Sequence, residues 1–303
     1  MKCPYCGQEH PDNYKFCPET AKPLTPQTKV CCNPDCKYEN VPIEAKFCPR
    51  CGCPFGDITP KGQIRIQVGE VNFNMIHVKA GSFFMGSNEY DDIFRGKPLH
   101  KVTITKDYYI GETVVTQKLW KEVMGHNPSY WGKKHGPYSD QWELLPVEQV
   151  DWFDCIDFIK KLNELTGRTF RLPTEAEWEF AARGGQESEG YKFAGSDIVE
   201  EVAWWPPCDQ SVHPVAQKKP NELGLYDMCG NIYEWCQDWL AEYNNEHQYD
   251  PVCNRPNYKD YKCRIIRGGH APHSGVCSVN GRNGSEPERW SNYIGFRLCM
   301  EME

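Results

Sequence analysis

The sequence predicts an α+β fold, irregular and rich in loops, preceded by two small cysteine modules. Three observations support this prediction. Nine of the 17 cysteines fall within the first 53 residues, short strand-like segments are spread along the rest of the chain, and two helices are well marked among them. Aromatic residues make up 13% of the chain and include 10 Trp, so we expect a core built from rings more than from aliphatic side chains. A chain of 303 residues is long enough for one large domain and a small one.

Charge and hydropathy exclude several classes of partner. The net charge is −8, and Lys and Arg do not outnumber Asp and Glu in the cysteine modules, so we expect no nucleic-acid partner. No apolar run is long enough to span a bilayer, and no signal peptide precedes the first cysteine. We therefore expect a cytoplasmic protein with no membrane partner. In a reducing compartment, the eight scattered cysteines from Cys155 to Cys299 are expected to be small buried side chains.

The second cysteine module, residues 27–56, has the spacing of a zinc ribbon. Cys32 and Cys36 form one pair of ligands, and Cys48 and Cys51 form the other. Four thiolates bind zinc tetrahedrally, and the ion replaces the core that so short a chain cannot build. The alternative is four unligated cysteines in a polar segment.

The first module, residues 1–26, is a degenerate zinc ribbon. Three cysteines match the pattern, but Thr20 stands where the fourth would be; the three are Cys3, Cys6 and Cys17. The missing ligand could come from a histidine or a spare cysteine: His10, Cys31 or Cys53. We expect zinc in both modules, which either dock a protein partner or serve as a structural cap. Residues 57–66, rich in Thr, Pro and Gly, are expected to be a linker.

Caps predict three helices in the main domain, over residues 116–125, 151–167 and 174–184. A Thr or Asp at the first position accepts a free amide of the helix, and a Gly at the end adopts the left-handed conformation that stops it. Alternation of polar and apolar residues predicts a strand or a short hairpin at residues 65–74 and strands at residues 76–78, 102–105, 108–110, 264–267 and 294–298. Arg171 and Arg183 flank the third helix and are expected to be ion-pair partners, unless either faces a ligand.

Residues 224–235 stand out because two carboxylates flank a Gly-Asn turn. Asp227 and Glu234 could bind a hard cation such as calcium, with carbonyls near Gly230 and Ile232 completing the shell. Glycine at position 230 permits the positive φ that such a loop usually needs. The alternative is a buried turn whose acids accept backbone amides, and the spacing alone leaves both interpretations open.

Five motifs, in order, resemble those of the formylglycine-generating-enzyme family, also called sulfatase-modifying factors. They lie at residues 81–86, 146–152, 171–183, 224–235, and 267–269 together with 295–297. The resemblance implies a C-type-lectin-like fold for residues 67–303. It also implies that the positions of Asp227, Gly230, Ile232 and Glu234 bind calcium. A second calcium site of the family is not expected, because Val202 stands where the family has Asn.

Catalytic members of this family carry a copper-binding cysteine pair shortly after residues 267–269. Here His273 and Ser278 stand at the matching positions, and Cys277 is one residue away. One misplaced thiol cannot reproduce paired-thiolate chemistry, so we expect a non-catalytic member. A metal-dependent oxidase with an unusual metal centre is one alternative. A fixed cytoplasmic adaptor is another. Separately, His270 and His273 could coordinate a metal.

The same segment resembles the variable region of proteins diversified by retroelements, some of which share this fold. Residues 270–275 are all reachable from an Asn codon by changes at adenines alone, and residues 280–285 and 291–293 are similar. Trp290 does not fit that origin and would be a template residue. We therefore expect a diversified surface at residues 270–293 that binds a ligand, expected to be a protein. Its predicted contact residues are His270, Ala271, Pro272, His273, Ser274, Gly275, Asn280, Gly281, Asn283, Gly284, Ser285, Trp290, Ser291, Asn292 and Tyr293.

Overall fold

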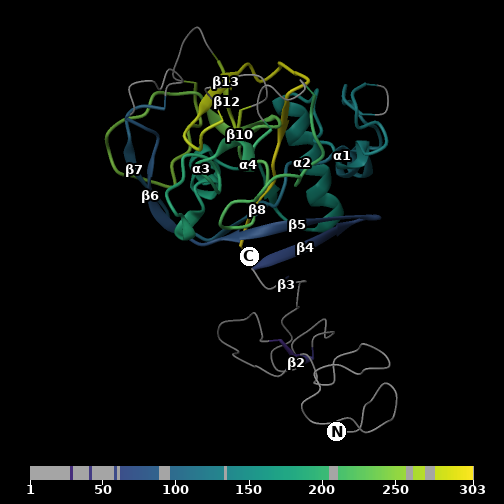
Figure 1. Ribbon diagram of the computed structural model, residues 1–303, viewed down its shortest axis with the longest axis horizontal. Helices are drawn as coiled ribbons and strands as arrows, with labels where there is room; N and C mark the ends of the chain where they lie inside the picture. The colour runs from purple at the N-terminus through teal and green to yellow at the C-terminus, as the bar shows by residue number, and fades with distance from the viewer. Residues whose placement is uncertain are drawn as a thin grey trace. The chain divides into compact units, whose positions relative to one another are not determined.

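The computed structural model (Figure 1) describes these parts of the main domain: residues 62–88, 96–132, 135–204, 211–256, 262–269 and 277–302. Three two-residue strands are described before them: β1 (Thr28–Lys29), β2 (Val41–Pro42) and β3 (Ile58–Thr59). The chain divides into two compact units, Met1–Ile58 and Thr59–Glu303. Every cysteine predicted to bind zinc lies outside the described residues, so the ribbons stay predictions.

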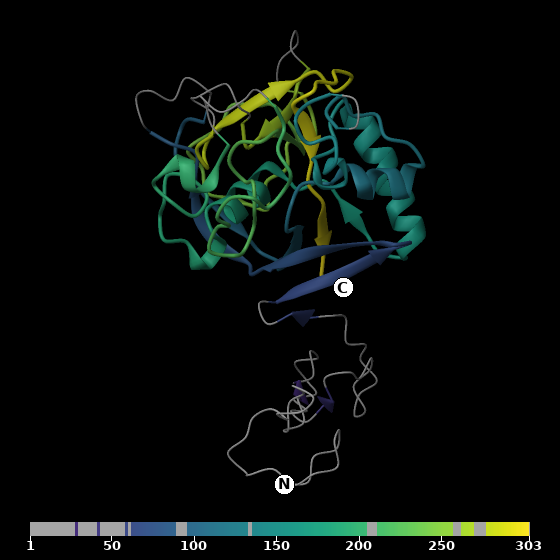
Figure 2. The ribbon, with the colours of Figure 1, turned by 45° about the vertical axis from the view of Figure 1, so that its right-hand side comes forward.

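The larger unit is mostly sheet. In one sheet the neighbours are, in order, β4 (Gln63–Val68), β5 (Val71–Val78), β8 (Tyr108–Gly111), β15 (Cys299–Glu301) and β9 (Phe170–Arg171). A second sheet has the order β13 (Arg282–Ser285), β12 (Arg264–Arg267), β10 (Tyr233–Trp239) and β14 (Ile294–Phe296). A third has the order β11 (Gln248–Tyr249), β7 (His100–Ile104) and β6 (Gly81–Met85). Strands β12 and β13 lie at the end of this unit opposite the β4–β5 hairpin (Figure 1 and Figure 2).

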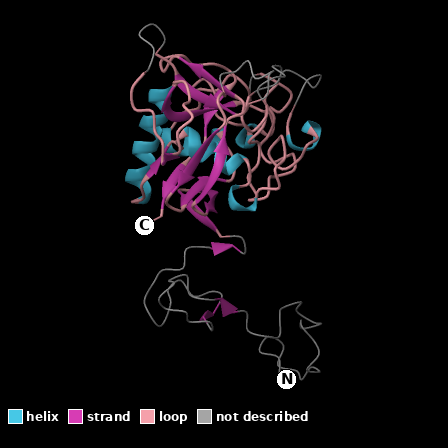
Figure 3. Ribbon diagram, turned by 90° about the vertical axis from the view of Figure 1, so that its left-hand side faces the viewer, coloured by secondary structure: helices cyan, strands magenta, loops and turns pink. Residues whose placement is uncertain are grey.

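The described residues of this unit form four α-helices and two 3-10 turns. They are α1 (Gln117–Met124), α2 (Trp152–Thr166), α3 (Glu175–Ala182), α4 (Val199–Val202), η1 (Trp142–Leu144) and η2 (Gly185–Glu187). The helices are drawn in cyan in Figure 3. The three predicted helices are confirmed. The side chain of Thr116 caps α1, Asp151 and Thr174 each form a capping box, and Gly125 and Gly167 end their helices in the left-handed conformation. Among the described residues, no helix is long and apolar enough to cross a bilayer.

The predicted strands are largely confirmed, with one correction at the C-terminus. The predicted closing strand, residues 294–298, is divided: β14 ends at Phe296, and β15 begins at Cys299 in a different sheet. Between them the chain crosses from one sheet to the other. The carbonyls of Phe296 and Leu298 accept the amides of Val115 and Gly111, which lie in a loop and at the end of β8. Strand β4 also begins at Gln63, inside the segment expected to be a linker.

The expectation of a core built from rings more than from aliphatic side chains is wrong, because Ile, Val and Leu outnumber the aromatic residues among the buried hydrophobic side chains. One cluster of three rings nevertheless packs within this core. Trp120 of α1 stacks on Phe158 of α2 with ring centroids 5.1 Å apart, and Phe296 of β14 meets both rings edge-on, at 6.1 and 5.3 Å. All three side chains are at most 2% exposed. Edge-to-face and stacked pairs of this kind contribute about 0.5–1.5 kcal/mol each beyond their buried area. This contact joins helices α1 and α2 to the second sheet.

Arg297 connects the two sheets. Its guanidinium is completely buried, and Nε and Nη2 donate to the two carboxylate oxygens of Glu234 on β10 at 2.9 and 2.8 Å. Nη1 donates to the carbonyls of Gly111 and Glu112, and Nη2 also donates to that of Tyr226. One side chain therefore holds the crossover to β10, to the end of β8, and to the loop that precedes β10.

Replacing Arg297 by Met should destabilise the domain by about 3–5 kcal/mol, because it leaves the buried charge of Glu234 without its partner. Urea unfolding would measure the loss. The control is Lys118→Met, which removes an exposed pair with Glu143 and should cost at most about 1 kcal/mol. Similar losses in both variants would contradict the role given to Arg297.

Candidate ligand-binding site

The predicted contact residues fall on two described elements. His270–Gly275 lie outside the described residues. The second group of predicted contact residues, those within 280–285, lies on and just before β13, which is an edge strand of its sheet. Asn283 is exposed and Asn280 and Gly284 are partly exposed, whereas Gly281 and Ser285 are buried. Alternate residues of a strand point to opposite faces, so only part of this group can meet a ligand directly.

The third group of predicted contact residues, residues 290–293, precedes β14. Trp290 is 60% exposed, and Ser291, Asn292 and Tyr293 are partly exposed. Tyr233 of β10 lies between this group and β13, because its backbone amide donates to the Tyr293 carbonyl at 2.8 Å and its side chain hydrogen-bonds Asn283. The structure thus brings the second and third predicted groups together around Tyr233 of β10.

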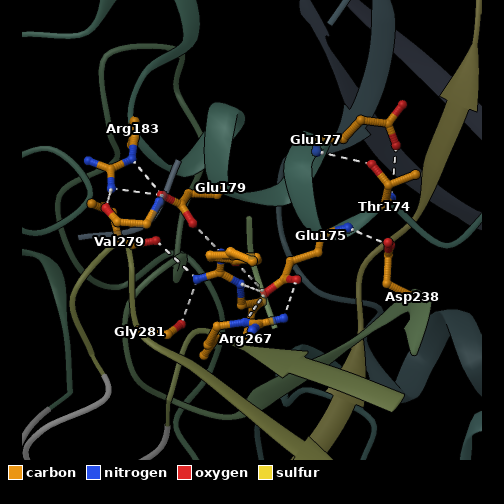
Figure 4. Close-up of polar contacts among 12 residues, drawn as sticks. Thr174, Glu175, Glu177, Glu179, Arg183, Asp238, Arg267, Val279 and Gly281 are labelled. Carbon is orange, nitrogen blue, oxygen red and sulfur yellow. Dashed lines mark hydrogen bonds and ion pairs between the residues drawn. The ribbon is translucent and has the colours of Figure 1, made fainter. Parts of the chain in front are cut away.

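A network of buried ion pairs fastens β12 and β13 to helix α3 (Figure 4). Arg282 of β13 makes a bidentate pair with Glu175, with both N···O distances 2.7 Å. Arg267 of β12 pairs with Glu179 and lies 3.1 Å from Glu175. Arg267 also donates to the carbonyls of Gly281, at 2.7 Å, and Val279. The turn before β13 is therefore held from below by a side chain that is itself completely buried.

All eight residues of helix α3 are buried, and each of its three glutamates pairs with an arginine. Arg183 donates to Glu179 at 2.7 Å, and Arg171 pairs with Glu177 at 2.7 Å, which confirms the prediction that these arginines are ion-pair partners. The sequence interpretation missed the deeper set. Its signal was Glu at every second position of the helix, a spacing that places carboxylates on more than one face.

Asp227 and Glu234, the predicted calcium ligands, are both buried, at 4% and 0% exposed. Glu234 accepts from Arg297 on both oxygens, and its Oε2 also accepts the indole N–H of Trp178 at 2.7 Å. Asp227 accepts the amide of Ala216 at 2.8 Å, as the alternative of amide-accepting acids expects. Burial raises the pKa of Asp227 to about 6, although the Ala216 amide and Arg297 act in the opposite direction.

The donor set suits a hard cation in chemistry. Two buried carboxylates face a single guanidinium, which leaves negative charge for a cation to balance. Among the described residues, no group of three or more His, Cys, Asp or Glu side chains gathers at one place, so calcium here would take backbone carbonyls for most of its shell. Gly230 has φ 77° and Asn231 φ 62°, a sharp turn of the kind that turns carbonyls inward. Calcium at Asp227, Gly230, Ile232 and Glu234 stays a prediction.

None of the described cysteines of the main domain forms a disulfide. Six of them, Cys155, Cys229, Cys236, Cys263, Cys277 and Cys299, are buried, as expected for small apolar side chains. Cys277 follows directly on the part of the segment that is not described, and it is 1% exposed. Burial raises the pKa of Cys229, and the nearby Cys277 contributes in the same direction. A thiol that is buried and protonated is a poor nucleophile and a poor metal ligand.

Glu148 is a buried acid that the sequence interpretation did not single out. It is completely buried; Oε1 accepts the Trp131 amide at 2.8 Å, and Oε2 has no hydrogen-bond partner. Burial raises the pKa of Glu148 to about 8, and the amides that bind it offset only part of this effect. The next residue, Gln149, has φ 59°, and its amide group donates to the side chain of Asn292 at 2.8 Å. The loop before α2 is thus connected to the third predicted group.

The fold and the site together define a C-type-lectin-like domain of the formylglycine-generating-enzyme type. The chain belongs to the family of the sulfatase-modifying factor enzyme 1-like domain, whose model matches residues 65–302. Among curated proteins it is 33% identical to the chaperone protein LppX of Paenibacillus barcinonensis, over 74% of this chain and 87% of that protein. It is 26% identical to the formylglycine-generating enzyme of Streptomyces coelicolor, over 83% of this chain and 84% of the enzyme.

Solved structures share the fold. Treponema denticola variable protein 1 matches with a TM-score of 0.70 and 30% identity, over 80% of this chain and all of that chain. The crystal structure of CarF matches with a TM-score of 0.58 and 24% identity, over 76% of this chain and 99% of that chain. The architecture predicted from the motifs is therefore confirmed.

The stability of the domain should fall as pH rises through the window set by Glu148. Its pKa is about 8 in the folded chain against 4.5 as the ordinary value, so the folded state binds the extra proton between these pH values. Stability is then lost with rising pH, by up to about 1.4 kcal/mol per pH unit. Glu148→Gln keeps the acceptor for Trp131 and cannot ionise. The free energy of unfolding of this variant, relative to that of the native chain, should therefore rise from pH 5 to about pH 8.

Urea unfolding at a series of pH values measures this difference. Glu143→Gln, a change at an exposed acid of η1, serves as the control and should follow the native curve. Parallel curves for the native chain and Glu148→Gln would show that Glu148 does not bind the proton.

Proposed function

We propose that this protein binds a protein ligand through residues 270–293 and that this segment is diversified in sequence. The observation that carries the proposal is the contrast between surface and frame. Asn283, Trp290 and Asn292 are exposed or partly exposed, while Arg267 and Arg282, on the strands that support them, are fixed by buried glutamates. A rigid frame under replaceable side chains lets contacts change without loss of the fold.

The similarity to a variable protein at 30% identity over that whole chain supports this proposal. The loss of the family's cysteine pair supports it as well, because His273 and Ser278 stand at the positions of the two thiols. In this proposal the protein is not an enzyme. The similarity to a formylglycine-generating enzyme keeps a metal-dependent oxidase as the second candidate. That candidate predicts copper or iron retained on purification and oxygen uptake with a thiol substrate, both lost in Cys277→Ala.

The coding sequence of sibling isolates of the source organism should differ within residues 270–293 and nowhere else in the domain. The exposed positions, Asn283 and Asn292 among them, should vary at template adenines. The buried Gly281, Arg282 and Ser285 should stay constant, because substitutions there disturb the ion pairs and the packing of β13. Sequencing the 3′ end of the gene from many isolates measures this. An identical segment in every isolate would contradict diversification and favour a fixed adaptor or an enzyme.

We further propose that calcium binds at Asp227 and Glu234 with the carbonyls of Gly230 and Ile232, and that zinc binds the N-terminal cysteines. Saturating calcium, at about 100 times its Kd, should raise the stability of the native chain by about 2.7 kcal/mol. Asp227→Asn should abolish this gain, whereas Asp157→Asn, a change at an exposed residue of α2, should preserve it.

Thermal unfolding with calcium and with chelator compares the variants. If calcium does not change the melting temperature of the native chain, the proposed calcium site is contradicted. Asp227 and Glu234 would then serve only as partners of Arg297 and the Ala216 amide. Metal analysis of the purified protein tests the zinc proposal, which fails if the protein contains no zinc.

A further inference from the structure

A pocket of about 410 Å³ opens between helix α1, turn η1 and the loop between them. Three aromatic side chains form much of its wall: Tyr130, Trp131 and Trp142. Polar groups complete the lining, among them Lys121 at the end of α1 and Gln149. The volume is large enough for one aromatic side chain together with a neighbouring group, and pockets with this kind of lining are typical of sites that hold an anchor residue.

The aromatic wall is held in place before any ligand arrives. Tyr130 meets Trp131 edge-on at 5.2 Å and stacks on His135 at 4.3 Å with the rings nearly parallel. The backbone of Trp131 is fixed at both ends of the residue, because its amide donates to Glu148 and its carbonyl accepts from Gln117. A wall that does not need to be ordered on binding costs little conformational entropy.

Lys121 gives the pocket a positive group. Among the described residues that line it there is no Asp or Glu, and Lys121 is exposed, with Nζ 5.4 Å from the centre of the Trp142 ring. Within the described part of the chain, Lys121 makes no ion pair, whereas Lys118 on the same helix pairs with Glu143 at 2.6 Å. Glu148 lies behind the wall, and the rise of its pKa to about 8 leaves it uncharged at neutral pH. Among the described lining residues, Lys121 is therefore the cation that a ligand would meet.

The pocket is continuous with the surface proposed to bind the ligand. Gln149, which lines it, donates from its backbone amide to the Ser291 carbonyl at 3.0 Å and from its side chain to Asn292 at 2.8 Å. The ring of Trp131 lies 6.2 Å from that of Tyr293. A ligand that covers residues 291–293 would reach this pocket with its next few residues.

We propose that this pocket is an invariant subsite of the ligand-binding surface, and that it takes an aromatic side chain of the protein ligand with an acidic residue beside it. This inference rests on the proposed function, in which residues 280–293 bind a protein. The ligand's ring packs against the rings of Tyr130 and Trp142 in offset or edge-on geometry. The neighbouring carboxylate pairs with Lys121, which makes no ion pair among the described residues and whose Nζ lies over the Trp142 ring.

Blocked dipeptides test the proposal on the full-length protein. Acetyl-Glu-Tyr-amide should perturb the Trp131 and Trp142 resonances in an NMR titration, and acetyl-Lys-Tyr-amide and acetyl-Glu-Ala-amide should bind about tenfold more weakly. Lys121→Glu should reverse the preference in favour of the Lys-Tyr peptide, and Lys118→Glu, the matched change on the same helix, should leave it as in the native chain. Added salt should weaken binding of the Glu-Tyr peptide more than binding of the other two peptides.

Equal binding of the Glu-Tyr and Lys-Tyr peptides would overturn the proposal, as would equal effects of the two lysine changes. A methyl glycoside that shifts the same resonances when no peptide does would assign the pocket to a carbohydrate instead and would also overturn it. The outcome is separable from that of the proposed function. Peptide binding reports on fixed residues, whereas the sequences of sibling isolates report on residues 270–293.

Discussion

Buried charge is the constraint on which the rest of this structure depends. Arg267, Arg282 and Arg297 are each at most 1% exposed, and each meets a glutamate that is nearly or completely buried. Removing one partner from such a pair costs several kcal/mol, because the remaining charge cannot reach water. The elements that carry these residues must therefore keep their positions relative to one another. Short strands with long loops between them acquire in this way a rigidity that their few ladder hydrogen bonds would not provide.

This frame explains how one fold can carry unrelated activities. The paired charges lie on helix α3, on strands β10, β12 and β13, and in the crossover after β14. The residues available to a ligand come from an edge strand and from loops. In β13, Arg282 points inward to Glu175, and the next residue, Asn283, is exposed. Changes at the exposed positions leave the pairs intact. Function in such a fold is decided by the site and not by the architecture, which agrees with a family whose relatives include an enzyme and a variable protein.

The turn at residues 227–234 shows how a single motif serves the fold by more than one contact. Glu234 accepts from Arg297 and Trp178, and so joins β10, the crossover and α3. Asn231 brackets the backbone of His213 with two hydrogen bonds, each 3.1 Å, which fixes the preceding loop against the turn. Asp227 fixes the same loop through the Ala216 amide. A cation bound here would add to contacts that already exist, so its contribution is to stability more than to shape.

The sequence by itself determined the family, the helix boundaries and most strands, because caps, alternation and motif order are local properties. Thr116, Asp151 and Thr174 cap helices through amides only three residues away, and such contacts can be read from spacing. Tertiary structure decided what depends on distant residues. The pairing of Glu175 with Arg282 spans 107 positions, and no local pattern indicates it. The division of the last strand at Arg297 and the pocket joining Trp131 to Gln149 arise for the same reason: a buried charge or a ring is placed by whatever the fold brings beside it.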